Sequence, residues 1–317
     1  MFKLAILGEI GSGNLGDDFG YCLIRDVLYK LFYKYDVVCN IDYYAPVQFP
    51  QLRNSRYDAV ITSCGTLLDK CGGNYVSELL RCQRAGSKIG VLGTGLSDPD
   101  HLPTTDEGIE TLNELISKCS HSWIRGEDGP DVFWVYGKYF NTVPVYNDDE
   151  TFAVNMGRAA FTYTNIDEIV AKIDQCATHF EKTMKMKTVS VWKADEKTYP
   201  EEILKKYPQV FVNGERKYNS AFRSIDYLVS FRAHLGVIAT CCGLLSFPVK
   251  FSSKVKKIFD LAIDDMTYLD VREDNWIEKI TEVLPKSKEI RTEREKKVKS
   301  AANRVFNNLE KFVKVVI

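Results

Sequence analysis

The sequence predicts an α/β protein of two domains, each built on a parallel sheet, and three observations lead to this class. Short apolar runs alternate with amphipathic stretches from the first residues onward, as strands and helices do in parallel sheets. The alternation stops at the polar segment 147–150 and then restarts. The chain has 317 residues, which exceeds one average domain of roughly 150 residues. We therefore expect one domain over residues 1–148 and a second over 151–285.

Each predicted strand of the first domain is a short apolar run. These runs cover residues 3–7, 37–41, 59–62, 88–92 and 122–124. The clearest helix follows the first strand, over about 18–33, because apolar residues recur there at helical spacing. Asp17 or Asp18 is placed to cap its start.

The second domain repeats this pattern, and a long helix follows it. Its predicted strands cover 152–155, 188–192, 210–212, 227–230 and 245–249. Its predicted helices lie near 166–184, 200–207, 233–242 and 274–284. The charged segment 286–317 carries apolar residues at helical spacing, so we expect a helix that packs back toward the first domain.

Composition and charge exclude several function classes. The 45% hydrophobic and 27% charged residues are typical of globular proteins, not of collagen-like or disordered chains. A net charge of -1 provides no field for holding nucleic acid, so no nucleic-acid partner is expected. The uncharged stretch from Leu235 to Val249 is shorter than the about 20 residues of a membrane span. Nine cysteines without any C-x-x-C indicate reduced thiols and no zinc site, and we expect a cytoplasmic protein.

A glycine-rich loop follows the first strand. Gly11 to Gly16 has the G-x-G-x-x-G spacing of a dinucleotide-binding turn. However, Asp42 lies farther beyond the loop than the about 20 residues usual for the ribose-binding carboxylate. Asp17 and Asp18 would also occupy the positive helix terminus that a pyrophosphate needs. Nicotinamide binding is therefore disfavoured, and a tight turn is the plainer interpretation.

The same loop, with the two aspartates, resembles the "N-x-G-D" segment of the polysaccharide pyruvyl transferase family. Four further segments are similar to that family in order and spacing. They are Tyr57 to Leu68, Gly90 to Leu96, Ser122 to Asp128, and Ser230 to Ala239 with Gly243 and Lys254 after it. The last contains Arg232-Ala233-His234, which matches the family's "R-x-H" helix start. Cys64 departs from the family by interrupting a run of glycines, and Leu245 departs by standing where a proline is common.

The resemblance implies a GT-B-like fold, with two Rossmann-type doubly wound parallel-sheet domains facing a cleft. It also implies transfer of a pyruvyl group from phosphoenolpyruvate to hydroxyls of a saccharide in cell-surface polysaccharide biosynthesis. A ketal forms and phosphate is released. No metal is required, and phosphoenolpyruvate is the donor substrate rather than a cofactor.

Two arginines and a histidine are the leading candidates on the donor side. Phosphoenolpyruvate carries a carboxylate and a phosphate, which guanidinium forks bind bidentately. Arg232 and Arg158 each follow a predicted strand of the second domain. His234, two positions after Arg232, is placed to protonate C3 of the enol as a general acid. The plainer alternatives are ion-paired arginines and a structural histidine.

The remaining candidates are shared between the domains. Gly13, Asn14 and Asp17 are expected to face the cleft from the acceptor side, with Asp17 as base or simply as helix cap. Lys254 is a candidate phosphate contact or part of an ordinary basic helix face. Arg125 either braces the cleft or pairs with Glu127.

Two other functions and a membrane contact stay open at this point. The same scaffold serves sugar-nucleotide-dependent glycosyltransferases, and it would also serve a non-catalytic carbohydrate-binding protein. If the acceptor saccharide is lipid-linked, the C-terminal helix, with an excess of six positive charges, is a candidate contact for an anionic membrane. A solvated helix face is the simpler explanation of that charge.

Overall fold

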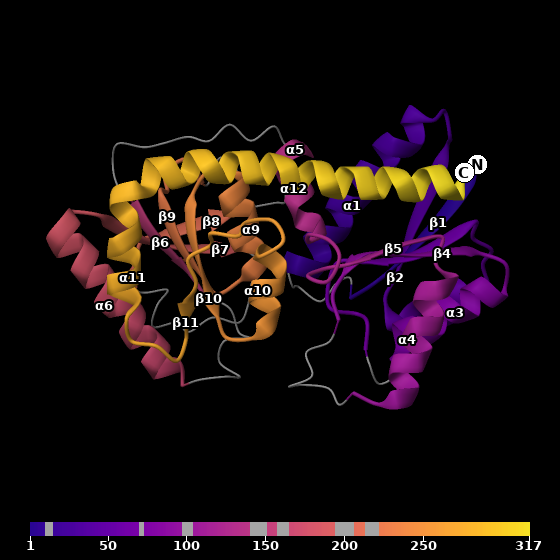
Figure 1. The fold of residues 1–317 in the computed structure, drawn as a ribbon, viewed down its shortest axis with the longest axis horizontal. Coiled ribbons are helices and arrows are strands. Elements are labelled where there is room, and N and C mark those ends of the chain that lie inside the picture. The colour runs from indigo at the N-terminus through magenta and orange to yellow at the C-terminus, as the bar shows by residue number, and fades with distance from the viewer. Residues whose placement is uncertain are drawn as a thin grey trace. The chain divides into compact units, whose positions relative to one another are not determined.

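A computed structural model describes residues 1–9, 15–69, 73–96, 104–139, 151–156, 165–193, 206–212 and 222–317. The chain forms two compact units (Figure 1). Unit 1 comprises Met1–Val135 with Ala301–Ile317, and unit 2 comprises Tyr136–Ser300. Each unit contains one parallel sheet, which confirms the predicted α/β class. The polar break at 147–150 lies outside the described residues.

Unit 1 contains a five-stranded sheet with the order β2-β1-β3-β4-β5. The strands are β1 (Phe2–Leu7), β2 (Cys39–Tyr44), β3 (Ala59–Ser63), β4 (Lys88–Thr94) and β5 (His121–Ile124). The second strand therefore begins and ends later than residues 37–41, the range expected from apolar periodicity. Short helical segments follow β2 and β5: η1 (Pro46–Gln48), α2 (Phe49–Arg53) and η2 (Val132–Val135).

Alternate residues of β1 face opposite sides of this sheet, because successive side chains of a strand do so. Ala5 and Leu7 join the core under α3 (Asn74–Arg84) and α4 (Asp106–Lys118). Phe2 faces the other way and its ring lies 5.1 Å from that of Phe32 in α1 (Leu15–Lys34). Both faces are thus covered, as parallel sheets require.

Helix α1 begins at Leu15, three residues before the predicted start. Asp17 and Asp18 therefore lie within its first turn, and the expectation that one of them caps the helix from outside is wrong. Carboxylates in a first turn still favour the helix, because they face the positive end of its dipole.

Unit 2 contains a six-stranded sheet with the order β11-β10-β9-β6-β7-β8. The strands are β6 (Thr151–Asn155), β7 (Lys187–Lys193), β8 (Gln209–Val212), β9 (Tyr227–Ser230), β10 (Leu245–Lys250) and β11 (Leu269–Asp270). The helices are α5 (Tyr136–Tyr139), α6 (Ile166–Met184), α9 (Ala233–Cys241), α10 (Ser253–Phe259), α11 (Trp276–Val283) and the single turn η4 (Leu284–Lys286). The predicted helix at 200–207 falls almost entirely outside the described residues.

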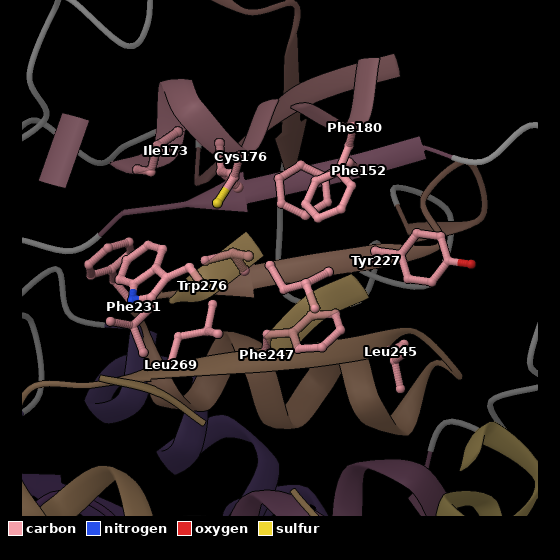
Figure 2. Packing of buried hydrophobic residues seen from close by; sticks show 14 of the residues in the cluster. Phe152, Ile173, Cys176, Phe180, Tyr227, Phe231, Leu245, Phe247, Leu269 and Trp276 are labelled. Carbon is pink, nitrogen blue, oxygen red and sulfur yellow. The ribbon is translucent and has the colours of Figure 1, made fainter. Parts of the chain in front are cut away.

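One face of this sheet packs against α6 and α11. Figure 2 shows the two aromatic rings of Phe152 and Phe180 together, and their centroids lie 5.1 Å apart. Trp276 of α11 lies beside Phe231, at 5.9 Å between ring centroids. The opposite face is covered by α9 and α10. Burial of these side chains, at about 25 cal/mol per Å² of apolar surface, is the main source of the unit's stability.

The C-terminal helix α12 (Ser287–Val316) contributes to both units, because the division between them falls after Ser300. In unit 1, Phe312 is fully buried, and a Cβ added at Gly90 of β4 would lie 3.0 Å from its ring. The close approach of helix and strand therefore depends on a glycine at 90. In the described part of the chain, no helix is both long enough and apolar enough to cross a membrane.

Two cations of α12 do not face solvent. Arg291 donates to the Asp226 carbonyl at 2.8 Å and lies 4.9 Å from the ring centroid of Tyr227. Arg294 is 2% exposed and donates to the Asp265 carbonyl at 3.2 Å. The charge excess counted from the sequence assumed that both arginines lie on an outward basic face of the helix. This assumption is wrong, because their side chains are buried.

Candidate functional site

Both sheets have a point where the strand order reverses, and ligands of open α/β sheets bind outside the carboxyl ends of the strands there. In unit 2 the chain runs from β6 outward through β7 and β8, then returns to β9 on the other side of β6. Its switch point therefore lies between β6 and β9. In unit 1 the corresponding point lies between β1 and β3.

The β9–α9 junction brings Arg232 to the unit 2 switch point. Strand β9 is fully buried, and Ser230 at its end donates a hydrogen bond to the Arg232 carbonyl at 2.8 Å. That carbonyl also accepts from the Gly236 amide at 3.0 Å, which closes the first turn of α9. Arg232 is thus the N-cap residue of a helix whose first amides have no partner within the helix. An anion at this position would meet amides and a guanidinium together.

The Arg232 side chain is partly buried. Burial lowers its pKa to about 10, so the guanidinium remains charged at neutral pH. His234 lies in the first turn of α9 and is 9% exposed. The two predicted donor-side residues therefore stand at the same helix start, as their spacing indicated.

Asn155 is a candidate that sequence reasoning missed. It ends β6 and pairs in register with Ser230 of β9, so it lies at the switch point itself. Its Nδ2 donates to the Val191 carbonyl at 2.9 Å. Its Oδ1 is buried and accepts no hydrogen bond from the residues that the structure describes. The available signal was a polar residue at the end of the otherwise apolar run 152–155.

Gly236 allows α9 to lie close to the sheet. A Cβ there would lie 3.2 Å from the Phe259 ring and 3.6 Å from the Ser230 Cβ. Thr240 and Ser246 both donate to the Gly236 carbonyl, at 2.8 and 3.3 Å. These contacts fix the orientation of α9, and with it the position of its first turn.

Lys254 is the second residue of α10, which follows β10. Because β10 neighbours β9 in a parallel sheet, the residues after both strands lie at the same sheet edge. Lys254 is partly exposed there. Arg158, the second predicted guanidinium, lies outside the described residues.

Three of the candidate residues of unit 1 lie in the glycine-rich loop and the start of α1. Gly13 and Asn14 lie outside the described residues, and of Asp17 only the backbone, in the first turn of α1, is described. After β3, Cys64 and Gly65 adopt φ values of 61° and 58°. A left-handed backbone favours glycine, so Cys64 adopts a conformation that is strained for its residue type.

Arg125 is an internal brace of unit 1. It is 2% exposed, donates to Asp131 Oδ2 at 2.9 Å, and donates to Thr66 Oγ1 at 2.8 Å. It therefore ties the loop after β3 to the loop after β5. The pairing with Glu127 weighed from the sequence is replaced by one with Asp131. Phe133 also donates its amide to Asp131, at 2.9 Å, so both carboxylate oxygens are bonded.

Among the described side chains, no three His, Cys, Asp or Glu residues are grouped as metal ligands.

The sequence matches no protein-family model and no curated protein. Solved structures do resemble it. The UDP-GlcNAc 2-epimerase from Neisseria meningitidis, bound to UDP-GlcNAc, gives a TM-score of 0.61 at 9% identity over 99% of each chain. The S. aureus MnaA–UDP structure gives 0.62 at 9% identity, over 93% of this chain and 91% of that one.

A glycosyltransferase gives a comparable match. SnogD from Streptomyces nogalater aligns with a TM-score of 0.55 at 10% identity over 98% of each chain. At 9–10% sequence identity, these structural similarities are evidence of a shared fold only. Together with the two parallel sheets, they show that this chain has a GT-B-like fold of two Rossmann-type α/β domains.

Proposed function

We propose that the chain is an enzyme that modifies a saccharide, using a phosphorylated donor bound at the unit 2 switch point. The observation that carries this proposal is that Arg232, at the N-terminus of α9, and the buried Asn155 Oδ1 both belong to the place where the neighbouring strands β9 and β6 end. A guanidinium and helix amides suit a phosphate, whereas an amide oxygen suits a hydroxyl. The site therefore offers partners to both parts of a phosphorylated sugar.

A nucleoside diphosphate sugar is the first candidate donor. Structures that share this fold contain UDP-GlcNAc, UDP and thymidine diphosphate. A diphosphate would lie across the α9 N-terminus with Arg232 on its oxygens, as diphosphates do at helix starts in Rossmann-type domains. In this scheme the chain is a sugar-nucleotide-dependent glycosyltransferase or a related enzyme.

Phosphoenolpyruvate is the second candidate, favoured by the Arg232-Ala233-His234 sequence at the helix start. His234 would protonate C3, which makes C2 electrophilic, and one saccharide hydroxyl would then attack C2. Loss of inorganic phosphate and attack by a second hydroxyl would close the ketal. Arg232 would hold the anion throughout. The lipid-linked acceptor and the membrane contact of α12 remain hypotheses, and with Arg291 and Arg294 buried the outward charge of that helix is smaller.

A thermal-shift comparison separates the candidates, because a ligand that binds only the folded state raises the unfolding midpoint. The ligands are UDP-GlcNAc, a thymidine diphosphate sugar, phosphoenolpyruvate and NAD, each at the same concentration. A shift with a nucleotide sugar alone supports the first candidate, and a shift with phosphoenolpyruvate alone supports the second. A shift with NAD alone, or with none of the four, would contradict the proposal.

A further inference from the structure

A cavity of about 480 Å³ lies beside the edge strand β2 of unit 1. We call it the β2 cavity. Its lining residues are Lys3, Asn40, Ile41, Asp42, Tyr43, Tyr44, Ser55, Arg56 and Tyr57. Its volume falls in the range of roughly 300–1,000 Å³ that is typical of small-molecule sites.

The strand register explains why this part of the sheet is open and polar. Lys3 pairs with Asn40, Ala5 with Asp42, and Leu7 with Tyr44, so these residues share one face of the sheet. On β1 that face carries the apolar Ala5 and Leu7 under helices α3 and α4. On β2 it carries Asn40, Asp42 and Tyr44 instead. Asn40 and Asp42 are not members of that core, whereas Tyr44 and Tyr57 pack against its edge.

The polar groups of the β2 cavity are held in place by one another. Asn40 Nδ2 donates to both oxygens of Asp42, at 3.2 and 3.1 Å. The Tyr57 hydroxyl donates to Asp42 Oδ2 at 2.8 Å and lies 2.5 Å from the Tyr44 hydroxyl. Burial, with the neighbouring Tyr44 and Asp42, raises the pKa of Tyr57 well above its usual value, so its hydroxyl stays protonated. Groups that are already ordered lose little entropy when a ligand binds.

The charges around the cavity balance. Lys3 and Arg56 are exposed cations on its lining, Asp42 is a carboxylate on it, and Asp58 beside it accepts from the Lys3 amide at 2.7 Å. This balance gives no preference for a free anion. It provides donors and acceptors side by side, which is what a hydroxyl group requires, since a hydroxyl both donates and accepts.

We propose that the β2 cavity binds a sugar unit of a saccharide, at a site separate from the switch points. Its hydroxyls would bond to Asp42, Tyr44, Lys3 and Arg56, and its ring would lie against Tyr44 and Tyr57, whose rings meet edge to face at 5.9 Å. The choice of a saccharide rests on the proposed function as well as on this chemistry.

Binding to an array of neutral and acidic oligosaccharides tests the proposal. Tyr57→Phe removes one hydroxyl and Arg56→Gln removes one exposed cation, while Tyr33→Phe and Arg223→Gln are matched controls at exposed positions outside the cavity. We expect the unmodified protein and both controls to retain a neutral glycan. Both cavity variants should bind it roughly tenfold more weakly, because Arg56→Gln removes a charged donor to the glycan and Tyr57→Phe removes the hydroxyl that orients Asp42. Arg56→Gln keeps the test valid if Tyr57→Phe proves unstable, because Arg56 is exposed.

Several outcomes would overturn the proposal. These are retention of no glycan by the unmodified protein, equal retention by cavity variants and controls, and loss of retention in Arg232→Lys instead. Tight binding of inorganic phosphate that the cavity variants lose would show an anion site. Donor binding by the cavity variants, followed by thermal shift, should be unchanged. The cavity proposal and the donor proposal can therefore fail separately.

Discussion

Hydrogen bonds from neighbouring residues hold the backbone of Arg232 in position. Ser230 and Gly236 both bond to its carbonyl, so its backbone is fixed at the end of β9. Arg232→Lys replaces a bidentate fork with a point charge, and we expect donor binding to weaken roughly tenfold. Calorimetric titration of the donor identified by thermal shift measures this change. Arg223→Lys, at an exposed position, is the control, and an equal loss in both variants would contradict a role for Arg232 in the site.

His234 should affect catalysis rather than binding if phosphoenolpyruvate is the donor. His234→Gln keeps the hydrogen bonding and approximate size of the side chain but cannot deliver a proton. Turnover should therefore fall by roughly 10²- to 10⁴-fold while the donor affinity stays the same. Phosphate release with a saccharide acceptor measures turnover. Full activity in this variant would exclude His234 as the acid.

We expect the Arg125–Asp131 ion pair to contribute to the free energy of unfolding. Both side chains are buried, so Asp131→Ala leaves a guanidinium without its counter-charge and should lower the free energy of unfolding by about 3–5 kcal/mol. Glu127→Gln, the partner considered from the sequence, should change it by less than about 0.5 kcal/mol because Glu127 is exposed. Urea unfolding of the two variants provides the comparison. Similar midpoints would show that the pair contributes little.

The end of helix α12 contributes buried side chains to the core of unit 1. Phe312 is fully buried against β4, so Phe312→Ala should destabilise the protein by about 3–5 kcal/mol through lost burial and a cavity. Lys311→Ala, on the exposed side of the same turn, should have little effect. Guanidinium unfolding followed by tryptophan fluorescence measures both. A small effect of Phe312→Ala would mean that the end of α12 is not part of the core.

The contact of β5 with α12 should also respond to pH. Burial, with Lys311 nearby, lowers the pKa of His121 in β5, while Asn308 and Asp128 oppose this shift. The unfolded chain then binds a proton more readily than the folded one, so stability falls as pH decreases through about 6.5. His121→Gln should remove that part of the pH dependence. Thermal midpoints of both proteins between pH 5 and 8 measure it, and parallel curves would contradict the assignment.

The elements also show what the sequence predicts and why some features escape it. Helix α6 and strand β9 were located to the residue, because apolar spacing and bounding polar residues mark their ends. Strand β11, with two residues, is too short to have a period. Because Arg291 and Arg294 are charged, the sequence suggests that they face solvent. They are buried because they lie on the same face of α12 as the apolar Val298, Ala302 and Val305, and this face packs against the core.

The candidate site in unit 2 was partly predictable, because the strand that precedes it has a clear apolar pattern. Arg232 and His234 follow a recognisable strand, so their place at the sheet edge could be inferred. The partner of Arg125 could not be inferred, because the turn at 126–130 brings Asp131 to it while the nearer Glu127 is exposed. The β2 cavity was missed because its Tyr57–Asp42 contact joins residues from different elements.

At the scale of the whole molecule, hydrogen exchange should locate the two ligands on different units. Donor binding should protect amides at the start of α9, around 230–236, because these amides face the proposed anion. A bound glycan should protect 40–44 and 55–57 in unit 1. Exchange measured by mass spectrometry with each ligand alone distinguishes these regions. Donor protection confined to the loops after β1 and β3 would move the donor to unit 1.

Unit 1 is discontinuous in the sequence, since Ala301–Ile317 completes a core begun by Met1–Val135. This has a consequence for synthesis on the ribosome, where the chain emerges from its N-terminus at about 5–20 residues per second. The five strands of unit 1 emerge before residues 301–317, and unit 2 is synthesised between them. Phe312 can therefore pack against Gly90 of β4 only after unit 2 has been synthesised. The core of unit 1 is completed later than its strands, and α1 is available to cover that face in the meantime.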